Sequence, residues 1–290
     1  GYTAAFRAAD LGKEVVLVEK YETLGGVCLN VGCIPSKSLL HTAQIINEAK
    51  HANELGISFG DTKIDIDGVR KSKESIVNKL TAGIQALAKA RKVKVVTGHA
   101  KFLSKNQVSL EGTDEVIEFE HCIIAAGSRV TKLPMFPFND ERVMDSTDAL
   151  MMDDIPKRLL VVGGGIIGLE MATIYDALGS EITMVELGEQ IIPQADKDIV
   201  TPLFKKIKKN YANVFLNTKV SKMSALKKGI KVDFEGKDSP STDTFDKVLV
   251  AVGRSPNGLA IDADKAGIEV DKSGFISTNS KMQTNVDNIF

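Results

Sequence analysis

Cysteine, one-sided charge and long apolar runs are all scarce in this chain of 290 residues. Three cysteines are too few for a disulfide scaffold and fit a reducing compartment. Lysine plus arginine (37) nearly balances aspartate plus glutamate (38), so no surface for nucleic acid or anionic membranes is indicated. No run of about 18 apolar residues occurs, and no secretion signal is recognisable. We therefore expect a protein of the cytoplasm, or of the mitochondrial matrix if the source is eukaryotic, with small-molecule partners.

The strongest nucleotide signal is the stretch "RLLVVGGGIIGLEMATIYDALGSEITMVE", residues 158–186. It predicts a strand, a tight glycine turn, a helix and a second strand that ends in an acid. Gly163, Gly165 and Gly168 have the spacing in which the first glycine makes the turn, the second admits a pyrophosphate, and the third allows close packing of helix on strand. Glu186 stands where a ribose-binding acid is expected. The alternative is a glycine-rich turn in an ordinary α/β unit.

The first twenty residues repeat the second half of this pattern at one constant offset. The matched positions are Gly1, Ala5, Leu11, Gly12, Glu14, Val18 and Glu19, which fall on Gly168, Ala172, Leu178, Gly179, Glu181, Val185 and Glu186. Gly1 is thus predicted to be the last glycine of a second fingerprint whose first strand and first glycines lie upstream. The alternative is a chance amphipathic helix followed by a strand.

The predicted fold class is α/β, with two Rossmann-like dinucleotide-binding domains of which the first is incomplete. We place the first domain at residues 1–147, the second at 148–272, and a return segment toward the first domain at 273–290. Apolar periodicity predicts helices over 36–50 and 73–90. Strands are predicted over 92–98, 118–128, 214–220, 229–236 and 246–253.

Two of the three cysteines, Cys28 and Cys33, lie five positions apart in "GGVCLNVGCIPSK", residues 25–37. A zinc site is disfavoured because no second pair of cysteines or histidines has ligand spacing. A purely structural bridge is disfavoured because so short a loop removes little unfolded-state entropy. A redox pair is the remaining interpretation. It agrees with a reducing compartment, where two cysteines close in sequence are more often catalytic than structural.

The geometry of the segment supports the redox interpretation. On an ideal helix the two Cα atoms would lie roughly 8–9 Å apart, whereas a disulfide allows no more than about 7 Å. The backbone is therefore predicted to be distorted, with Gly25, Gly26 and Gly32 permitting the path and Pro35 in the first turn of the next helix. A helix N-terminus with a lysine nearby favours the thiolate form of a cysteine.

The segment "GGVCLNVGCIPSKSLL" resembles the redox-active segment of the flavin-dependent disulfide oxidoreductases, whose members act on lipoamide, glutathione, trypanothione and mercuric ion. The stretches "IIAAGS", "GGGIIGLE", "AVGRSPN" and "TNVDNIF" match the same family in order. Within the family, "GCIPSKSLL" is most similar to the lipoamide enzymes. The resemblance implies FAD in the first domain and NAD in the second.

The resemblance also implies roles for four residues in catalysis. Cys33 would face the flavin, and Cys28 would exchange with the substrate. Lys37 would stabilise negative charge on the flavin, the alternative being a solvated lysine. Glu170 would form an ion pair with Lys37 beside the flavin, the alternative being an acid that suits its helix dipole. Cys122 is expected in the core, and His41, His51, His99 and His121 are expected to be non-catalytic.

Cofactor contacts are expected in both domains, and no metal site is expected. Glu19 and Glu186 would each accept hydrogen bonds from an adenosine ribose, of FAD and NAD respectively; for Glu186 the alternative is a charged strand end. The expected contacts in the first domain are Gly1, Glu19, Lys20, Gly25, Gly26, Val27, Cys28, Lys37, Ala100 and Gly127. Those in the second domain are Gly163, Gly164, Gly165, Ile166, Ile167, Gly168, Glu186, Val220, Ala251, Val252, Gly253 and Arg254.

The reaction implied is oxidation of dihydrolipoamide: the substrate reduces the Cys28–Cys33 disulfide, Cys33 passes two electrons to FAD, and NAD is reduced to NADH. The implied partners are the lipoyl domain of a 2-oxo-acid dehydrogenase complex and a second subunit of a homodimer. One alternative is a reductase of the glutathione or mercuric type running from NAD(P)H. Another is a non-catalytic nucleotide-binding fragment, against which the intact cysteine pair argues.

The family has further parts beyond a run like "TNVDNIF": a flavin-contacting segment with an aspartate, and a C-terminal interface domain with a His-Glu pair. Residues 1–290 hold neither, so the resemblance implies a fragment shortened at both ends. Such a fragment is expected to bind NAD weakly, FAD poorly, and to have almost no activity alone.

Overall fold

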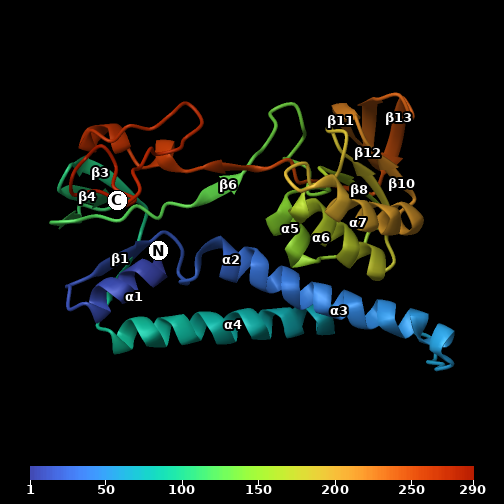
Figure 1. Cartoon of the computed structure of the whole chain (residues 1–290), viewed down its shortest axis with the longest axis horizontal. Helices are drawn as coiled ribbons and strands as arrows, with labels where there is room; N and C mark the ends of the chain where they lie inside the picture. Colours follow the sequence, from blue (N-terminus) through green and yellow to red (C-terminus); the bar gives the residue numbers. More distant parts are fainter. The chain divides into compact units, whose positions relative to one another are not determined.

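The computed structural model describes residues 1–290 (Figure 1). The chain forms two compact units, and each unit is made of segments that are separate in sequence. Unit 1 consists of Gly1–Asn30, Val77–Arg129 and Arg254–Phe290, and unit 2 consists of Val31–Ile76 and Val130–Gly253. A long helix that follows the cysteine segment joins the core of the later part of the chain, so that segment belongs to unit 2. The predicted domain boundaries at 147/148 and 272/273 remain a prediction.

A parallel five-stranded sheet forms the centre of unit 2, in the order β10 (Asn213–Phe215), β9 (Glu181–Val185), β8 (Arg158–Val162), β14 (Lys247–Val250) and β7 (Val143–Met144). Helix α6 (Ile166–Ala177) connects β8 to β9. Both faces of β8 are buried, as expected for a parallel strand covered on two sides. This is the predicted Rossmann-like arrangement, and the α/β class is confirmed.

Alternate residues of β8 belong to two different hydrophobic cores. Leu159 and Val161 pack with residues of α3 (Cys33–His51), α5 (Ser146–Met151), α6 and α7 (Lys197–Asn210). Leu160 and Val162 pack with an antiparallel sheet of β11 (Lys219–Leu226), β12 (Gly229–Glu235) and β13 (Thr242–Phe245). Figure 1 shows this layering within unit 2, with α5 and α6 below β8 and β11–β13 above it.

Helix α3 lies along α6, and its buried Leu39 and Ile46 enter the same core. A 3₁₀ turn, η1 (Ala52–Leu55), follows α3, and α4 (Ile66–Ala90) then runs from unit 2 into unit 1. The predicted helix over 73–90 thus begins a further two turns earlier. No helix of the chain has the length and apolar character that a membrane crossing requires.

Unit 1 contains α1 (Tyr2–Asp10), β1 (Val16–Glu19), α2 (Gly26–Val31) and β2 (Lys94–Thr97), with β1 and β2 paired in parallel. The helix α1 and strand β1 correspond in the internal repeat to α6 and β9, and β2 pairs with β1 as β10 pairs with β9. Phe6, Leu24 and Val93 form a small core between these elements. The helix and strand predicted by the repeat are therefore present.

The rest of unit 1 is a meander of β3 (Ala100–Ser104), β4 (Gln107–Leu110) and β5 (Val116–Glu118), packed on the C-terminal segment with η2 (Gly258–Ala260) and η3 (Ala263–Ala266). A two-stranded ribbon of β6 (Ser128–Val130) and β15 (Arg254–Pro256) begins and ends at the unit boundaries.

Two of the predicted strands differ in the structure. The strand predicted over 118–128 is wrong: β5 ends at Glu118, and only Cys122 forms an isolated bridge, to Ile289. The N–H groups of Cys122 and Ile124 donate to the carbonyl oxygens of Asn288 and Phe290, in the same direction as the bridge to Ile289. The strand predicted over 214–220 is broken between β10 and β11, where Asn217 has a positive φ of 48°.

An ion pair between Arg142 and Asp140, next to β7, makes a pH-dependent contribution to stability. The Arg142 guanidinium donates to both oxygens of Asp140, at 2.8 and 2.7 Å, and to the carbonyl of Leu226 at 3.0 Å. These hydrogen bonds lower the pKa of Asp140 to about 2. The folded carboxyl therefore stays charged at pH values where the unfolded one, with a pKa near 4, takes up a proton.

We predict that Asp140→Asn lowers the free energy of unfolding by about 1 kcal/mol at pH 7, a value that allows for solvent screening. The contribution is present above pH 4 and is lost as the pH falls from about 4 to about 2. Urea unfolding from pH 7 to pH 2.5 measures it, with the exposed Asp238→Asn as the matched control. A difference between Asp140→Asn and the parent that stays constant over this range would contradict the assignment.

Candidate functional site

The glycine turn after β8 shows three separate steric demands. Gly163 has φ 109°, and a Cβ there would lie 2.4 Å from the carbonyl oxygen of Ala251. A Cβ at Gly168 would lie 2.1 Å from the carbonyl oxygen of Gly163, which is far inside van der Waals contact. Gly165 differs from both, since an added Cβ would meet nothing within 4 Å. The first and third glycines are thus required by packing, whereas the second borders open space.

The N-terminus of α6 opens onto this space. Gly165 is its N-cap residue, and no side chain caps the first N–H groups. Uncapped N–H groups at a helix N-terminus carry partial positive charge and bind phosphate groups. An open cradle at Gly165, with donors directed into it, fits the pyrophosphate of a dinucleotide.

Glu186 follows β9 and is held beside the same turn. Its Oε2 accepts a hydrogen bond from the N–H of Gly164, and its Oε1 accepts one from the N–H of Gly188, both at 2.7 Å. Each carboxylate oxygen keeps a lone pair for a further donor. The carboxylate is therefore oriented by the glycine turn and retains acceptor capacity for ribose hydroxyls.

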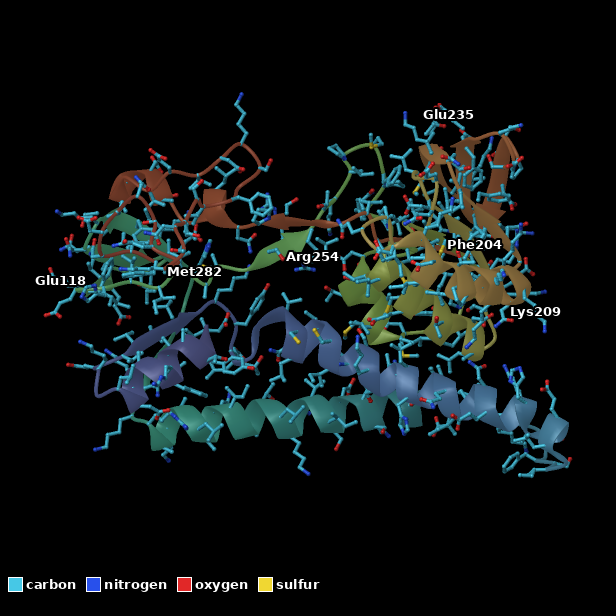
Figure 2. All side chains as sticks on the ribbon, viewed as in Figure 1. Glu118, Phe204, Lys209, Glu235, Arg254 and Met282 are labelled. Atoms are coloured by element: carbon cyan, nitrogen blue, oxygen red, sulfur yellow. The ribbon has the colours of Figure 1, made fainter.

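Two other residues expected to contact the second nucleotide have side chains that are already buried or hydrogen-bonded within the protein. The side chain of Val220 is buried in the core under β11, which leaves only its backbone for a ligand. Arg254 lies in unit 1, where its guanidinium donates to the hydroxyl and the carbonyl oxygen of Ser128 at 2.8 and 2.6 Å (Figure 2). Its charged group thus fastens β15 to β6. Ala251, Val252 and Gly253 follow β14 directly, and Ile166 and Ile167 form the exposed first turn of α6.

The cysteine segment is not one continuous helix, which confirms the predicted distortion. Helix α2 ends at Val31, Gly32 has the non-helical angles φ −146° and ψ −115°, and α3 begins at Cys33. Gly25 and Gly26 have positive φ values of 119° and 62°. Both Cys28, on α2, and Cys33, in the first turn of α3, are solvent-exposed. Pro35 lies in the first turn of α3, as predicted, and is buried.

The expected ion pair between Lys37 and Glu170 is present in unit 2. Lys37 Nζ lies 2.5 Å from Glu170 Oε1 and joins α3 to α6, each about one turn after the start of its helix. Cys33 and Lys37 are four residues apart on α3, so their side chains lie on the same face of that helix. An exposed ion pair contributes little to stability. Its effect is to orient the ammonium group on the helix face that carries Cys33.

The residues expected around the first cofactor mark local turns and strand ends. Gly1 is the N-cap of α1, Glu19 ends β1, and Ala100 begins β3. A carboxylate oxygen of Glu19 accepts a hydrogen bond from the N–H of Tyr21 at 3.2 Å. Gly127 has φ 67°. Lys20 lies over the ring of Tyr21, with Nζ 4.8 Å from its centroid, and Val27 is exposed in the first turn of α2. Their contacts to a cofactor remain predictions.

Two polar residues of the cysteine segment were missed by the sequence reasoning. Asn30 donates to the carbonyl oxygens of Leu24 and Gly26, at 3.2 and 3.0 Å. Ser36 is buried, and its hydroxyl donates to the carbonyl oxygen of Gly32 at 2.6 Å. Asn and Ser are residues that bond to nearby backbone where helices break. Asn30 and Ser36 lie on either side of Gly32, so their positions in the sequence could have indicated these hydrogen bonds at the helix break.

The third cysteine and the histidines show no comparable arrangement. Burial raises the pKa of Cys122 to about 11, in agreement with the predicted core position. His99 Nδ1 lies 2.8 Å from a carboxylate oxygen of Glu111, whose other oxygen accepts a hydrogen bond from Lys101. No cluster of three or more His, Cys, Asp or Glu side chains has metal-binding geometry.

Surface hollows also lie outside the predicted sites. One of about 520 Å³ is lined by Thr201, Phe204, Lys205, Lys208 and Lys209 of α7 (Figure 2). Lysines in the last turns of a helix complement its dipole, which accounts for this basic surface. Another hollow, of about 540 Å³, lies beside Ser104 and Glu118 on the β3–β5 meander.

Comparison with known proteins assigns the family. A sequence model of the pyridine nucleotide-disulphide oxidoreductases matches residues 1–290. The chain belongs to the pyridine nucleotide-disulphide oxidoreductase family. Dihydrolipoyl dehydrogenases from Vibrio cholerae and Haemophilus influenzae are each 54% identical to it over 293 residues. The alignments cover 100% of this chain and 62% and 61% of those proteins. The chain thus spans about three fifths of the length of these relatives.

A solved structure supports the same assignment. The HOCl-induced flavoprotein disulfide reductase RclA from Escherichia coli matches with a TM-score of 0.86 at 26% identity, over 100% of this chain and 62% of RclA. The predicted family is therefore confirmed, together with its fold. The predicted cofactors agree with a family defined by its pyridine nucleotide and with the flavoprotein nature of RclA.

The glycine turn provides a matched pair of variants. We predict that Gly168→Ala destabilises the protein by about 2–3 kcal/mol, because the new methyl group overlaps the backbone of Gly163. Gly165→Ala should retain the stability of the parent, since its φ of −75° suits alanine and its Cβ meets no atom. Gly165→Ala should nevertheless weaken NADH binding at least tenfold. Urea unfolding and NADH fluorescence titration measure the two effects, and equal behaviour of the two variants would contradict the separate roles.

Proposed function

We propose that the protein to which these residues belong is a dihydrolipoyl dehydrogenase, an enzyme that oxidises dihydrolipoamide to lipoamide and reduces NAD to NADH. The observation that carries the proposal is the interrupted cysteine segment. Gly32 separates Cys28 on α2 from Cys33 at the start of α3, and Lys37, one turn further, is paired with Glu170. The name and 54% identity of the relatives support dihydrolipoamide as the substrate.

The proposed reaction at the cysteines is thiol–disulfide exchange. A thiolate of dihydrolipoamide attacks Cys28 Sγ, the Cys28–Cys33 bond breaks, and Cys33 leaves as a thiolate. The second thiol of the substrate then attacks the mixed disulfide, which releases lipoamide and the Cys28 thiol. The protein dithiol has gained the two electrons and two protons that the substrate has lost. FAD, when bound, would supply the two-electron chemistry that links this dithiol to NAD.

The residues near Cys33 favour its role as the leaving group. Cys33 stands in the first turn of the 19-residue helix α3, at the positive end of the helix dipole. Lys37 lies on the same helix face and adds a positive charge, and Glu170 fixes the direction of its ammonium group. Cys28, on the short helix α2, lacks that long dipole and is proposed as the exchange thiol.

The second nucleotide is proposed to bind at the N-terminus of α6. The uncapped N–H groups after Gly165 hold its pyrophosphate, and the carboxylate of Glu186 accepts hydrogen bonds from its ribose. Gly163, Gly168 and the end of β14 shape the turn. Gly1, Glu19, Ala100 and their neighbours are proposed to bind the adenosine part of FAD in the corresponding place of unit 1.

The partners and the location are proposed on the same grounds. The dihydrolipoamide is carried by the lipoyl domain of a 2-oxo-acid dehydrogenase complex, the enzyme acts as a homodimer, and it works in the cytoplasm. The similarity to RclA, a disulfide reductase, favours a second candidate: a reductase that runs from NAD(P)H toward another disulfide. The higher identity to the lipoamide enzymes, 54% against 26%, favours the first.

We predict that Cys28→Ser and Cys33→Ser each lower dihydrolipoamide-dependent NADH formation by at least 10³-fold, because either change removes the disulfide. Oxidation of NADH by ferricyanide, which bypasses the thiols, should be retained in both variants. Cys122→Ala serves as the control, since Cys122 lies in the core under β5 and is expected to be needed only for packing. Retained lipoamide activity in either serine variant would overturn the proposed function.

The coenzyme preference follows from the charge of Glu186. A 2′-phosphate would lie against this carboxylate, so we predict that kcat/KM favours NAD over NADP by about a hundredfold or more. Glu186→Gln keeps one acceptor oxygen and removes the charge, and it should reduce the preference about tenfold. Steady-state kinetics with both coenzymes measure the ratio. Equal kcat/KM values for NAD and NADP in the parent protein would rule out this role of Glu186.

A further inference from the structure

The turn that carries Cys28 is closed by the side chain of Asn30. Asn30 Nδ2 donates to the carbonyl oxygen of Gly26, one helical turn back, at 3.0 Å, and to that of Leu24 at 3.2 Å. The hydroxyl of Thr23 donates to Asn30 Oδ1 at 3.0 Å. These two carbonyl partners fix the orientation of the amide, because the flipped amide would direct Oδ1 at two other acceptors. Cys28 lies inside the loop that these hydrogen bonds close.

Helix α2 is short, so contacts beyond its own backbone contribute to its order. It has only six residues, far fewer than the 12–15 or so that an isolated helix requires. Its only buried side chain is Leu29, and the chain leads into it through Gly25 and Gly26 at positive φ. A Cβ at Gly25 would lie 2.5 Å from the Leu29 side chain, so the backbone there packs tightly on that residue. The hydrogen bonds of Asn30 add to this contact and tie the Cys28 turn to the segment that precedes it.

The order of this turn affects the chemistry proposed for Cys28. A disulfide forms only when the two sulfur atoms are held within a narrow range of distance and angle. A thiol on a mobile turn spends less time in that range, so its effective concentration at the second thiol is lower. We propose that Asn30 is a positioning residue that sets the dithiol–disulfide equilibrium of Cys28 and Cys33. This inference rests on the proposed function, in which the two cysteines form the redox pair.

The equilibrium is measured with glutathione as the co-reactant. Cys28 and Cys33 give up two electrons and two protons and form one disulfide, while one oxidised glutathione becomes two reduced glutathione molecules. The equilibrium constant of this exchange is the effective concentration of one thiol at the other. If Cys28 is less ordered, this equilibrium constant is lower, and the protein disulfide is easier to reduce.

The test uses the purified flavoprotein and variants that remove these hydrogen bonds in steps. Asn30→Ala removes the whole link, Asn30→Asp removes the Nδ2 donor while keeping the size, and exposed Thr23→Val removes only the bond to Oδ1. We expect the equilibrium constant to fall about tenfold for Asn30→Ala and Asn30→Asp, equivalent to a potential about 30 mV less negative. Thr23→Val should lower it about twofold. The control is Asn78→Asp, the same change at an exposed position of α4.

The outcomes separate the inference from the proposed function. Mass spectrometry first establishes whether the oxidised parent protein contains a Cys28–Cys33 disulfide, and its absence would overturn the proposed function itself. If the disulfide forms but all three variants keep the parent equilibrium within the error shown by Asn78→Asp, the positioning role of Asn30 is wrong. A purely structural role would lower the melting temperature without moving the equilibrium. If Asn30→Ala fails to fold, Asn30→Asp and Thr23→Val decide the question by the same measurement.

Discussion

The close approach of α6 to β8 is the constraint on which the candidate sites of unit 2 depend. Gly168 lies so near the carbonyl of Gly163 that no side chain fits between them. This contact fixes the N-terminus of α6 beside Gly165 and, about one turn further along the helix, the position of Glu170. Through Glu170 it also determines the direction of Lys37 on α3. A single backbone contact thus relates the phosphate cradle to the helix that begins at Cys33.

The features that the sequence predicted well are those with local steric causes. The spacing of Gly163, Gly165 and Gly168 reports the turn, the open cradle and the close packing directly, because each demand falls on one residue that must lack a side chain. The break at Gly32 was predictable for a similar reason, since a continuous helix holds Cys28 and Cys33 too far apart. The ion pair of Lys37 with Glu170 came from the family resemblance alone, because nothing in either segment indicates its partner.

The features that the sequence did not predict have tertiary causes. The packing of Leu39 and Ile46 against α6 brings residues far apart in sequence together, and no composition change marks it. Residues 122–124 are as apolar as a strand, and their backbone pairs with residues 288–290, which no local pattern identifies as the partner. The hydrogen bonds of Asn30 and Arg254 are made to backbone groups, whose positions a sequence does not reveal. Prediction was thus reliable for sterics within a segment and weak for contacts between segments.

The burial of Cys122 leaves the accessible thiols of the chain in one place. Its thiol, with a pKa near 11, is protonated at neutral pH and half-buried, so electrophiles and peroxides react with it slowly. The two exposed cysteines lie on either side of Gly32. A peroxide that oxidises one of them to a sulfenic acid leaves a second thiol five residues away to resolve it as a disulfide. Because the proposed catalytic cycle reduces that same disulfide, turnover also reverses this oxidation of the exposed thiols.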